Sequence, residues 1–157
     1  MYPVPTSVDP WIGGVRLDIT KKAEYAISLL LELALSPQED FLASREVGER
    51  RSVPANLVPQ LVSILSKAGW VEAVRGPKGG IRLSADPSQI TLVAVIEAVE
   101  GPITVSRCLV QHGKTCPNQT HCPLKNVWAK AQRQVLEVLG DTSIADLVKA
   151  QRELLDV

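Results

Sequence analysis

Three cysteines carry the strongest chemical signal in this sequence. Cys108, Cys116 and Cys122 are the only cysteines of the chain, and they fall within 15 residues. An odd number of cysteines packed so closely fits a disulfide framework poorly. Thiolates are the preferred ligands of iron-sulfur clusters and of zinc, and three of them on one loop can converge on a single inorganic core. We therefore expect a metal site here.

The spacing of the cysteines separates the possible metal sites. Zinc ribbons place ligands at two-residue intervals, which this segment lacks, and neither His112 nor His121 completes a zinc-finger pattern. We therefore rank an iron-sulfur cluster, 2Fe-2S or 4Fe-4S, above zinc, and zinc above inert thiols. A lone cysteine is usually an inert buried side chain, but three in one short segment are poorly explained by coincidence.

The residues after the last cysteine predict a long helix. Their apolar side chains recur at intervals of four, three, four and three residues, a heptad-like seam typical of a helix-to-helix dimer contact. This seam consists of Leu124, Trp128, Ala131, Val135 and Val138. We expect Gly140 to close the helix and Ser143 with Asp146 to open a last helix through a capping box. The buried face of that last helix would hold Ile144, Leu147, Val148, Leu154 and Leu155.

The first half of the chain predicts three helices. Two apolar stripes indicate a helix from about Leu17 to Ser36 that is covered on two sides. A shorter helix is expected over residues 44–50, with Ser44 as its cap. After a break at residues 51–54, the third helix is expected to begin near Pro59, because proline is tolerated in a first turn. Its buried face would hold Leu57, Leu61, Ile64, Leu65 and Ala68.

A β-hairpin is expected next. Two short apolar runs, at residues 70–74 and 81–83, flank the glycine-rich turn RGPKGG of residues 75–80. Three helices followed by a hairpin is the order of a winged helix-turn-helix domain. A further apolar helix over residues 91–99 then stops at Gly101-Pro102.

A polar stripe on the third helix suggests contact with nucleic acid. Short polar and basic side chains that point away from the core can reach base edges in the major groove. Alone, such a stripe is more often an ordinary solvated face. The adjacent hairpin favours contact with nucleic acid, since the segment from Lys67 to Arg82 contains four basic residues against one acidic residue, Glu72. The candidate DNA-binding residues are Arg45, Arg50, Arg51, Asn56, Gln60, Ser63, Lys67, Arg75 and Lys78.

Composition sets the broad class of protein. The 157 residues are 45% hydrophobic and 22% charged, which fits one folded unit and excludes a disordered chain. Seventeen basic residues balance seventeen acidic ones, so the net charge does not indicate a nucleic-acid partner. No leader-like segment and no apolar run of membrane-spanning length is visible, so we expect a cytoplasmic protein. The sequence shows no Ser/His/Asp set, phosphate loop or dinucleotide fingerprint, so no motif in it indicates an enzyme.

Three segments of the chain resemble one known family. The stretch VRLDITKKAEYA at residues 15–26, the wing VRGPKGGIRL at residues 74–83 and the cysteine triplet are similar to the Rrf-two family of winged-helix transcription regulators. The similarity extends from Val15 to about Val148, and the wing motif is quite specific. The resemblance implies a homodimer that binds a two-fold operator in double-stranded DNA and holds an iron-sulfur cluster with the three cysteines.

The same resemblance suggests a fourth cluster ligand. The subgroup that regulates cluster assembly has a histidine three residues after the last cysteine, where this chain has Lys125. In the nitric-oxide-sensing subgroup an acidic residue early in the first helix, given by the other subunit, completes the site, and Glu24 occupies that position. A glutamate at a helix start also favours the macrodipole, and His112 is a competing donor. The cysteine spacing resembles both nitric-oxide and iron sensors.

We therefore expect a mainly α fold with a small β-hairpin, a winged helix-turn-helix joined to a long dimerisation helix. Residues 1–14 would be a flexible, dispensable tail, 15–86 the DNA-binding domain, and 87–157 the cluster loop and dimerisation helices. The expected function is that of a DNA-binding transcriptional regulator, a repressor, which senses iron, nitric oxide or redox state through its cluster. The alternatives are a thiol/disulfide switch, a zinc site, or an interaction module that has lost DNA binding.

Overall fold

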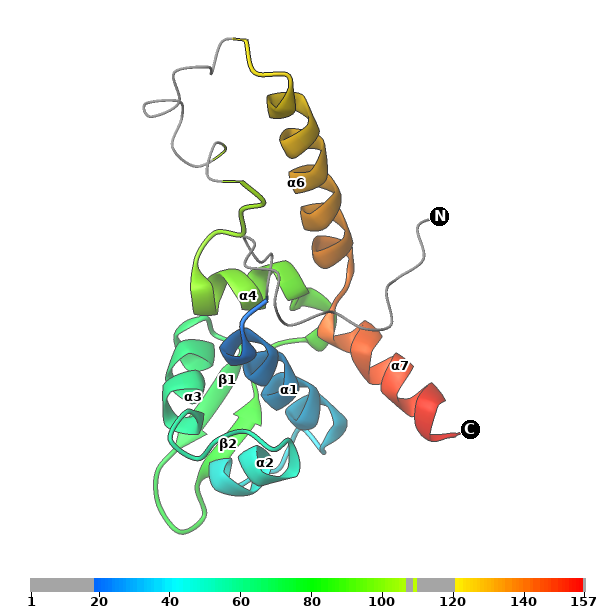
Figure 1. Ribbon diagram of the computed structural model, residues 1–157. Helices are drawn as coiled ribbons and strands as arrows, with labels where there is room; N and C mark the ends of the chain where they lie inside the picture. The colour runs from blue at the N-terminus through cyan, green and yellow to red at the C-terminus, as the bar shows by residue number, and fades with distance from the viewer. Residues whose placement is uncertain (1–18, 107–108, 110–120, 157) are drawn as a thin grey trace.

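The computed structural model describes residues 19–106, 109 and 121–156, and its elements confirm the expected fold class. The described elements are helices and one two-stranded antiparallel hairpin, which lies at the edge of the molecule (Figure 1). The elements are α1 (Lys21–Leu35), α2 (Ser44–Arg50), α3 (Val58–Lys67), β1 (Val71–Val74), β2 (Gly80–Leu83), η1 (Pro87–Gln89), α4 (Leu92–Glu100), α6 (Leu124–Asp141) and α7 (Ile144–Leu155). Among these helices none is long and apolar enough to cross a membrane.

Helix α1 lies at the centre of the core. Thr20 caps it by accepting a hydrogen bond from the Ala23 amide at 3.2 Å. One stripe of α1 is fully buried (Ala23, Ala26, Leu29, Leu30 and Leu33) and packs against α2, α3, α4, α7 and β2. The second predicted stripe, with Ile27 and Leu31, is half-buried. The helix ends at Leu35, directly before the Ser36-Pro37 stop that the sequence predicts.

A tight turn joins α2 to α3. The Ser52 amide donates to the Glu49 carbonyl and the Val53 amide to the Gly48 carbonyl, which is the Schellman pattern of helix termination. Ser52 adopts the left-handed conformation that this pattern needs, with φ 53°. Helix α2 spans the predicted residues, but Ser44 is not its cap: Ala43 holds that position and makes no side-chain hydrogen bond. Pro59 lies in the first turn of α3, as expected.

The wing is anchored by a third segment of chain. Strands β1 and β2 pair Val71 with Leu83, and the backbone of Leu42 exchanges two hydrogen bonds with Ile81, at 2.8 and 2.9 Å. Gly80 permits this approach, since a Cβ there would overlap the Leu42 carbonyl. It also has a φ of 146°, which side-chain-bearing residues rarely adopt.

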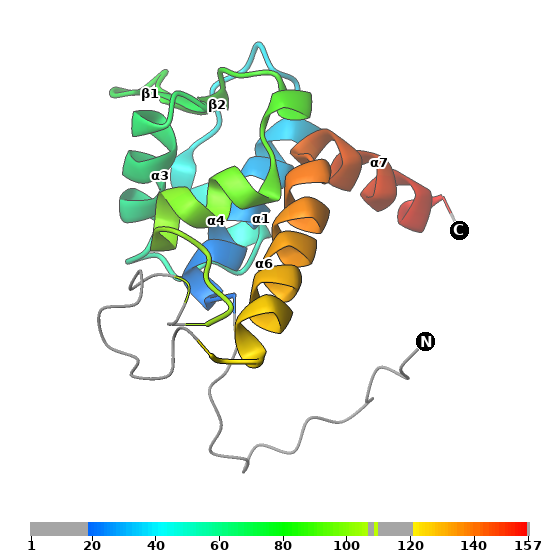
Figure 2. The same cartoon turned by 90° about the horizontal axis from the view of Figure 1, so that it is seen from above.

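The C-terminal helices leave the winged domain in two directions. The Leu92 amide donates to the Thr142 carbonyl and the Ile144 amide to the Ile90 carbonyl, so α4 and α7 begin beside each other. From this junction α6 extends away from the hairpin and α7 leads toward the C-terminus, as Figures 1 and 2 show. The predicted capping box of Ser143 and Asp146 is confirmed.

Two predictions about buried faces are wrong. In α7, Ile144 and Val148 are buried, but Leu154 and Leu155 are 77% and 73% exposed, because α7 projects beyond the core there. In α3, Leu61 and Leu65 are buried as expected. Ala68 is exposed because the helix has already ended at Lys67, and Val58 fills the core instead.

Candidate nucleic-acid interface and cysteine segment

The outer face of α3 carries the predicted polar stripe. Gln60, Ser63 and Lys67 lie on the helix and are exposed, and Asn56 is exposed in the turn just before it. On the opposite side, Leu61 and Leu65 fix the helix to the core. The stripe therefore has the orientation that readout of base edges requires.

The tip of the wing presents two cations. Arg75 and Lys78 are exposed, and no described carboxylate lies within ion-pair distance of either. Arg82 differs, because its guanidinium pairs with Glu72 across the hairpin at 2.8 Å and stacks 4.5 Å from the centre of the Phe41 ring. The basic excess that the sequence shows is thus concentrated at Lys67, Arg75 and Lys78.

The arginines of α2 and its turn have carboxylate partners. Arg45 pairs with Glu49 one helical turn away, and this hydrogen bond raises the arginine pKa. Arg50 pairs with Glu32 and Glu46, which raise its pKa in the same way. Arg51 is 20% exposed and pairs with Glu32 at 2.7 Å. These three side chains lie near the α2–α3 turn, as the sequence suggests. Arg50 and Arg51 are held by Glu32 of α1, whereas the Arg45 pair is exposed and lies within α2.

The candidate cluster ligands lie partly outside the described residues. Cys108 and Cys116 are among those not described, as is the competing donor His112. Cys122 is described: its half-buried thiol is free, and it lies two residues before α6. Glu24 is exposed on the first turn of α1, where it pairs with Lys21. The described residues contain no group of three or more metal-binding side chains.

Glu24 and Cys122 of one chain lie far apart. The residues that line a groove beside α6 indicate this separation. Thr20, the cap of α1, lines this groove together with Val135 and Val138 of α6. Val135 lies 11 residues after Leu124, the first residue of α6, a rise of roughly 16 Å in an α-helix, and Cys122 precedes Leu124. Figure 1 shows that α1 runs away from the first turn of α6. The two side chains therefore do not meet within one subunit.

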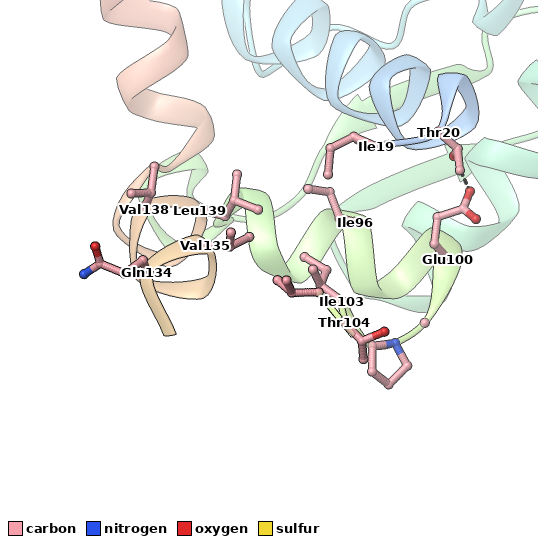
Figure 3. A pocket seen from close by; sticks show the side chains of 13 residues that line it. Ile19, Thr20, Ile96, Glu100, Ile103, Thr104, Gln134, Val135, Val138 and Leu139 are labelled. Carbon is pink, nitrogen blue, oxygen red and sulfur yellow. Dashed lines mark hydrogen bonds between the residues drawn. The ribbon is translucent and has the colours of Figure 1, made fainter. Parts of the chain in front are cut away.

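The groove itself is apolar and has a volume of about 710 Å³. Figure 3 shows Val135 and Leu139 of α6 facing Ile96 and Ile103, with Val138 at the outer edge of the groove. Its rim carries a hydrogen bond between the Thr20 hydroxyl and the Glu100 carboxylate. Along the predicted seam, Val138 is 66% and Leu124 is 51% exposed. The seam is thus only partly covered within one chain.

Sequence reasoning missed Gln132 of α6. Its side-chain amide donates to the Ile103 carbonyl at 2.6 Å and accepts from the Val105 amide at 2.7 Å. These two bonds fix the backbone that leads to Cys108 against the helix that follows Cys122. The sequence offered one weak signal, an uncharged polar residue beside the apolar seam.

Comparisons with known proteins agree with this architecture. A family model described as "Rrf2: Iron-dependent Transcriptional regulator" matches residues 19–150. The HTH-type transcriptional regulator IscR of Vibrio atlanticus is 32% identical over 142 residues, covering 90% of this chain and 80% of that protein. IscR of Xenorhabdus nematophila is 34% identical over 139 residues, covering 88% and 83%.

Solved structures show the same relationship. CymR, described as the global cysteine regulator of B. subtilis, superposes with a TM-score of 0.70 at 29% identity, covering 86% of this chain and 98% of that chain. IscR of T. potens superposes with a TM-score of 0.67 at 26% identity, covering 87% and 90%. The resemblance seen in the wing and the cysteine triplet is therefore confirmed. This chain belongs to the Rrf2 family of transcriptional regulators.

Proposed function

We propose that this protein is a homodimeric repressor that binds a two-fold operator and responds to a signal through an iron-sulfur cluster. One observation carries the DNA-binding part of the proposal. The exposed stripe of α3 and the wing cations Arg75 and Lys78, which have no described carboxylate partner, belong to adjoining elements of one domain. Membership of a family of transcriptional regulators supports it.

The two kinds of DNA contact have different consequences. Arg75 and Lys78 lie on a glycine-rich loop, so they are suited to phosphates, whose contacts carry no sequence information. Gln60 is suited to a base edge, because its amide can donate and accept at once. Asn56, Ser63, Lys67 and Arg45 complete the contact surface that we propose, and Arg50 and Arg51 adjoin it.

Substitutions at these residues test DNA binding. Arg75→Ala and Lys78→Ala should weaken binding to an operator selected from random duplexes and to random DNA alike, and should reduce the salt dependence of both. Gln60→Ala should cost about 1–3 kcal/mol on the selected operator only. Lys149→Ala, which removes an exposed cation of α7, is the matched control. Equal loss on both DNAs would remove Gln60 from the reading set.

The exposed positions of the α6 seam support the homodimer. A second copy would cover Leu124 and Val138 and the apolar groove beside them, because the heptad-like spacing suits a helix of the same sequence. Val138→Asp should therefore shift sedimentation equilibrium toward the monomer. Glu137→Gln, at the neighbouring exposed position, should leave the association unchanged. A Val138→Asp protein that remains fully dimeric would place the interface elsewhere.

The donor set fits an iron-sulfur cluster. Cys108, Cys116 and Cys122 would hold it, and Glu24 of the partner subunit would complete the site, since Glu24 and Cys122 of one chain do not meet. The free Cys122 thiol and the exposed Glu24 carboxylate are both accessible to such a group. When bound, the cluster supplies sensitivity to iron supply, oxygen or nitric oxide.

Mixed dimers test whether Glu24 acts across the subunits. A Cys122→Ala chain lacks a thiolate but keeps Glu24, and a Glu24→Ala chain has the reverse defect. In a mixed dimer, donation across subunits restores one complete site, so a cluster with the parent's reactivity toward oxygen or nitric oxide should appear. Donation within one subunit would restore none. If Glu24→Ala alone matches the parent while His112→Ala loses the cluster, His112 is the fourth ligand.

A thiol/disulfide switch or a zinc site is the second candidate, and one comparison favours it. The structural relative CymR is described as the global cysteine regulator of B. subtilis, and the described Cys122 thiol is free. Anaerobic purification separates the candidates: a cluster gives visible absorbance with matching iron and sulfide. A colourless protein with reversible thiol oxidation or bound zinc would contradict the cluster.

A further inference from the structure

The carboxylate of Glu32 joins distant parts of the chain. It lies on α1 with only 14% of its side chain exposed. Oε2 accepts a hydrogen bond from Arg51 Nε at 2.7 Å, and Oε1 accepts from Arg50 Nη1 at 3.2 Å. A carboxylate with one guanidinium on each oxygen is held strongly, because both hydrogen bonds are charge-assisted.

The two arginines lie where α2 becomes the turn that leads to α3. Arg50 is the last residue of α2 and Arg51 is its C-cap. The next residue, Ser52, has the left-handed conformation that redirects the chain. The direction in which α3 leaves the turn therefore depends on how these residues are fixed.

Arg51 carries the linkage to the C-terminal helix. Its Nη1 donates to the Gln151 side-chain oxygen of α7 at 3.2 Å. Arg51 thus touches α1 through Glu32 and α7 through Gln151, although Gln151 is 100 residues away in sequence. Because guanidinium is planar and presents several donors in fixed directions, a lysine would not span both partners in the same way.

We propose that Glu32 is a positioning residue for DNA reading: it fixes the α2–α3 turn to α1 and, through Arg51, to α7. It does so from the core side of the domain, without contact to DNA. A shift of α7 would then change the direction of α3. This inference rests on the proposed DNA-binding function, which it extends to a residue outside the interface.

Two variants separate the parts of this network. Glu32→Gln keeps the size of the side chain but removes its charge and turns an amide donor toward one arginine. Gln151→Leu removes only the contact with α7. Glu153→Gln is the matched control, because it makes the same charge change at an exposed position of α7.

The first measurement is hydrogen exchange at the Ser52 and Val53 amides, which needs no DNA. Both variants should exchange faster there than the parent, with the centre of α1 unchanged and Glu32→Gln showing the larger effect. Unchanged exchange at the turn in Glu32→Gln would overturn the inference, whatever the protein does with DNA.

The second measurement is affinity for the selected operator and for random duplex, well below the melting temperature. Glu32→Gln should lose about 2-fold to about 30-fold on the operator, the range found along coupled networks, while random-DNA affinity follows the control. Operator affinity equal to the control would overturn the inference. A parent that selects no operator would instead refute the proposed function, and the exchange result would still decide the role of Glu32 in the turn.

Discussion

Gly48 offers a sharp test of how closely α2 and α3 must approach. It is buried in α2 and faces Val58, the first residue of α3. A Cβ built on Gly48 would lie 2.6 Å from Val58 Cγ2. Carbon atoms in contact prefer about 3.5–4.0 Å, so Gly48→Ala requires α3 to move by roughly 1 Å or Val58 to leave its rotamer.

Two opposing free-energy contributions, overpacking and helix propensity, set the cost of that movement. Overpacking a core typically costs about 1–3 kcal/mol, and a valine in a helix has one strongly preferred rotamer, so Val58 yields poorly. Alanine regains about 1 kcal/mol over glycine in a helix. The expected net loss is therefore about 1 kcal/mol, or a fall in melting temperature of about 2–4 °C for a chain of this size.

Urea unfolding of metal-free protein at one fixed concentration measures this loss, since dimerisation makes stability depend on concentration. Val58→Ala is the partner variant. Alone, this substitution should lower the free energy of unfolding by about 1.6 kcal/mol through lost burial of apolar surface. It also creates room for a methyl group at position 48. The double variant should then be more stable than the sum of the single losses predicts. Additive losses, or a Gly48→Ala protein as stable as the parent, would refute the close contact.

Three further predictions concern the turn, α7 and the cysteine segment. Ser52→Gly should stabilise the protein by about 0.5–1 kcal/mol in urea unfolding, because glycine adopts the left-handed conformation without strain; a loss of stability would contradict the Schellman turn. Hydrogen bonds from the Ser143 hydroxyl and amide lower the pKa of Asp146 in the folded protein. The ionised carboxylate therefore stabilises the fold fully above the pKa of aspartate in the unfolded chain, near 4. This stabilisation is lost as the pH falls through the lower pKa of the folded state. Melting scans from pH 6 to pH 3 should show a smaller decline for Asp146→Asn than for the parent, and parallel declines would argue against the capping box. Gln132→Met should cost about 1–3 kcal/mol by leaving two backbone groups unpaired, whereas Asn126→Met, at an exposed position of the same helix outside the groove, should not; equal losses would refute the bridging role.

Local patterns predicted the elements well where the physics is local. The capping box of Ser143 and Asp146 was visible because both residues lie within one turn. The hairpin followed from turn residues between two apolar runs. Periodicity shows which residues share a helix face, but it does not show what covers that face. Leu154 and Leu155 continue an apolar face of α7 yet are exposed, because the core ends before they are reached.

The candidate site was predictable only in part, for the same reason. The stripe on α3 and the cations of the wing are consecutive features, so the sequence shows them together. Arg50 and Arg51 appeared as a free basic edge because their shared partner, Glu32, lies 18 and 19 residues earlier. No local rule connects those positions. The partners of Gln132 are equally hard to predict, since the backbone groups it binds lie 27 and 29 residues before it.

The position of Cys122 restricts how a signal could reach the DNA-reading surface. It lies at the end of α6 that is remote from the hairpin, and α6 is 18 residues long, or about 27 Å. A charge change at that distance is largely screened, because the Debye length is about 8 Å at physiological ionic strength. Within one subunit, we therefore propose a mechanical connection. It runs along α6 to its contact with α4, through the junction of residues 142–144 into α7, and from Gln151 to Arg51 beside α3. A rigid helix transmits translation and rotation over that length. A change in the cysteine segment would therefore change the position of α7 relative to the α2–α3 turn.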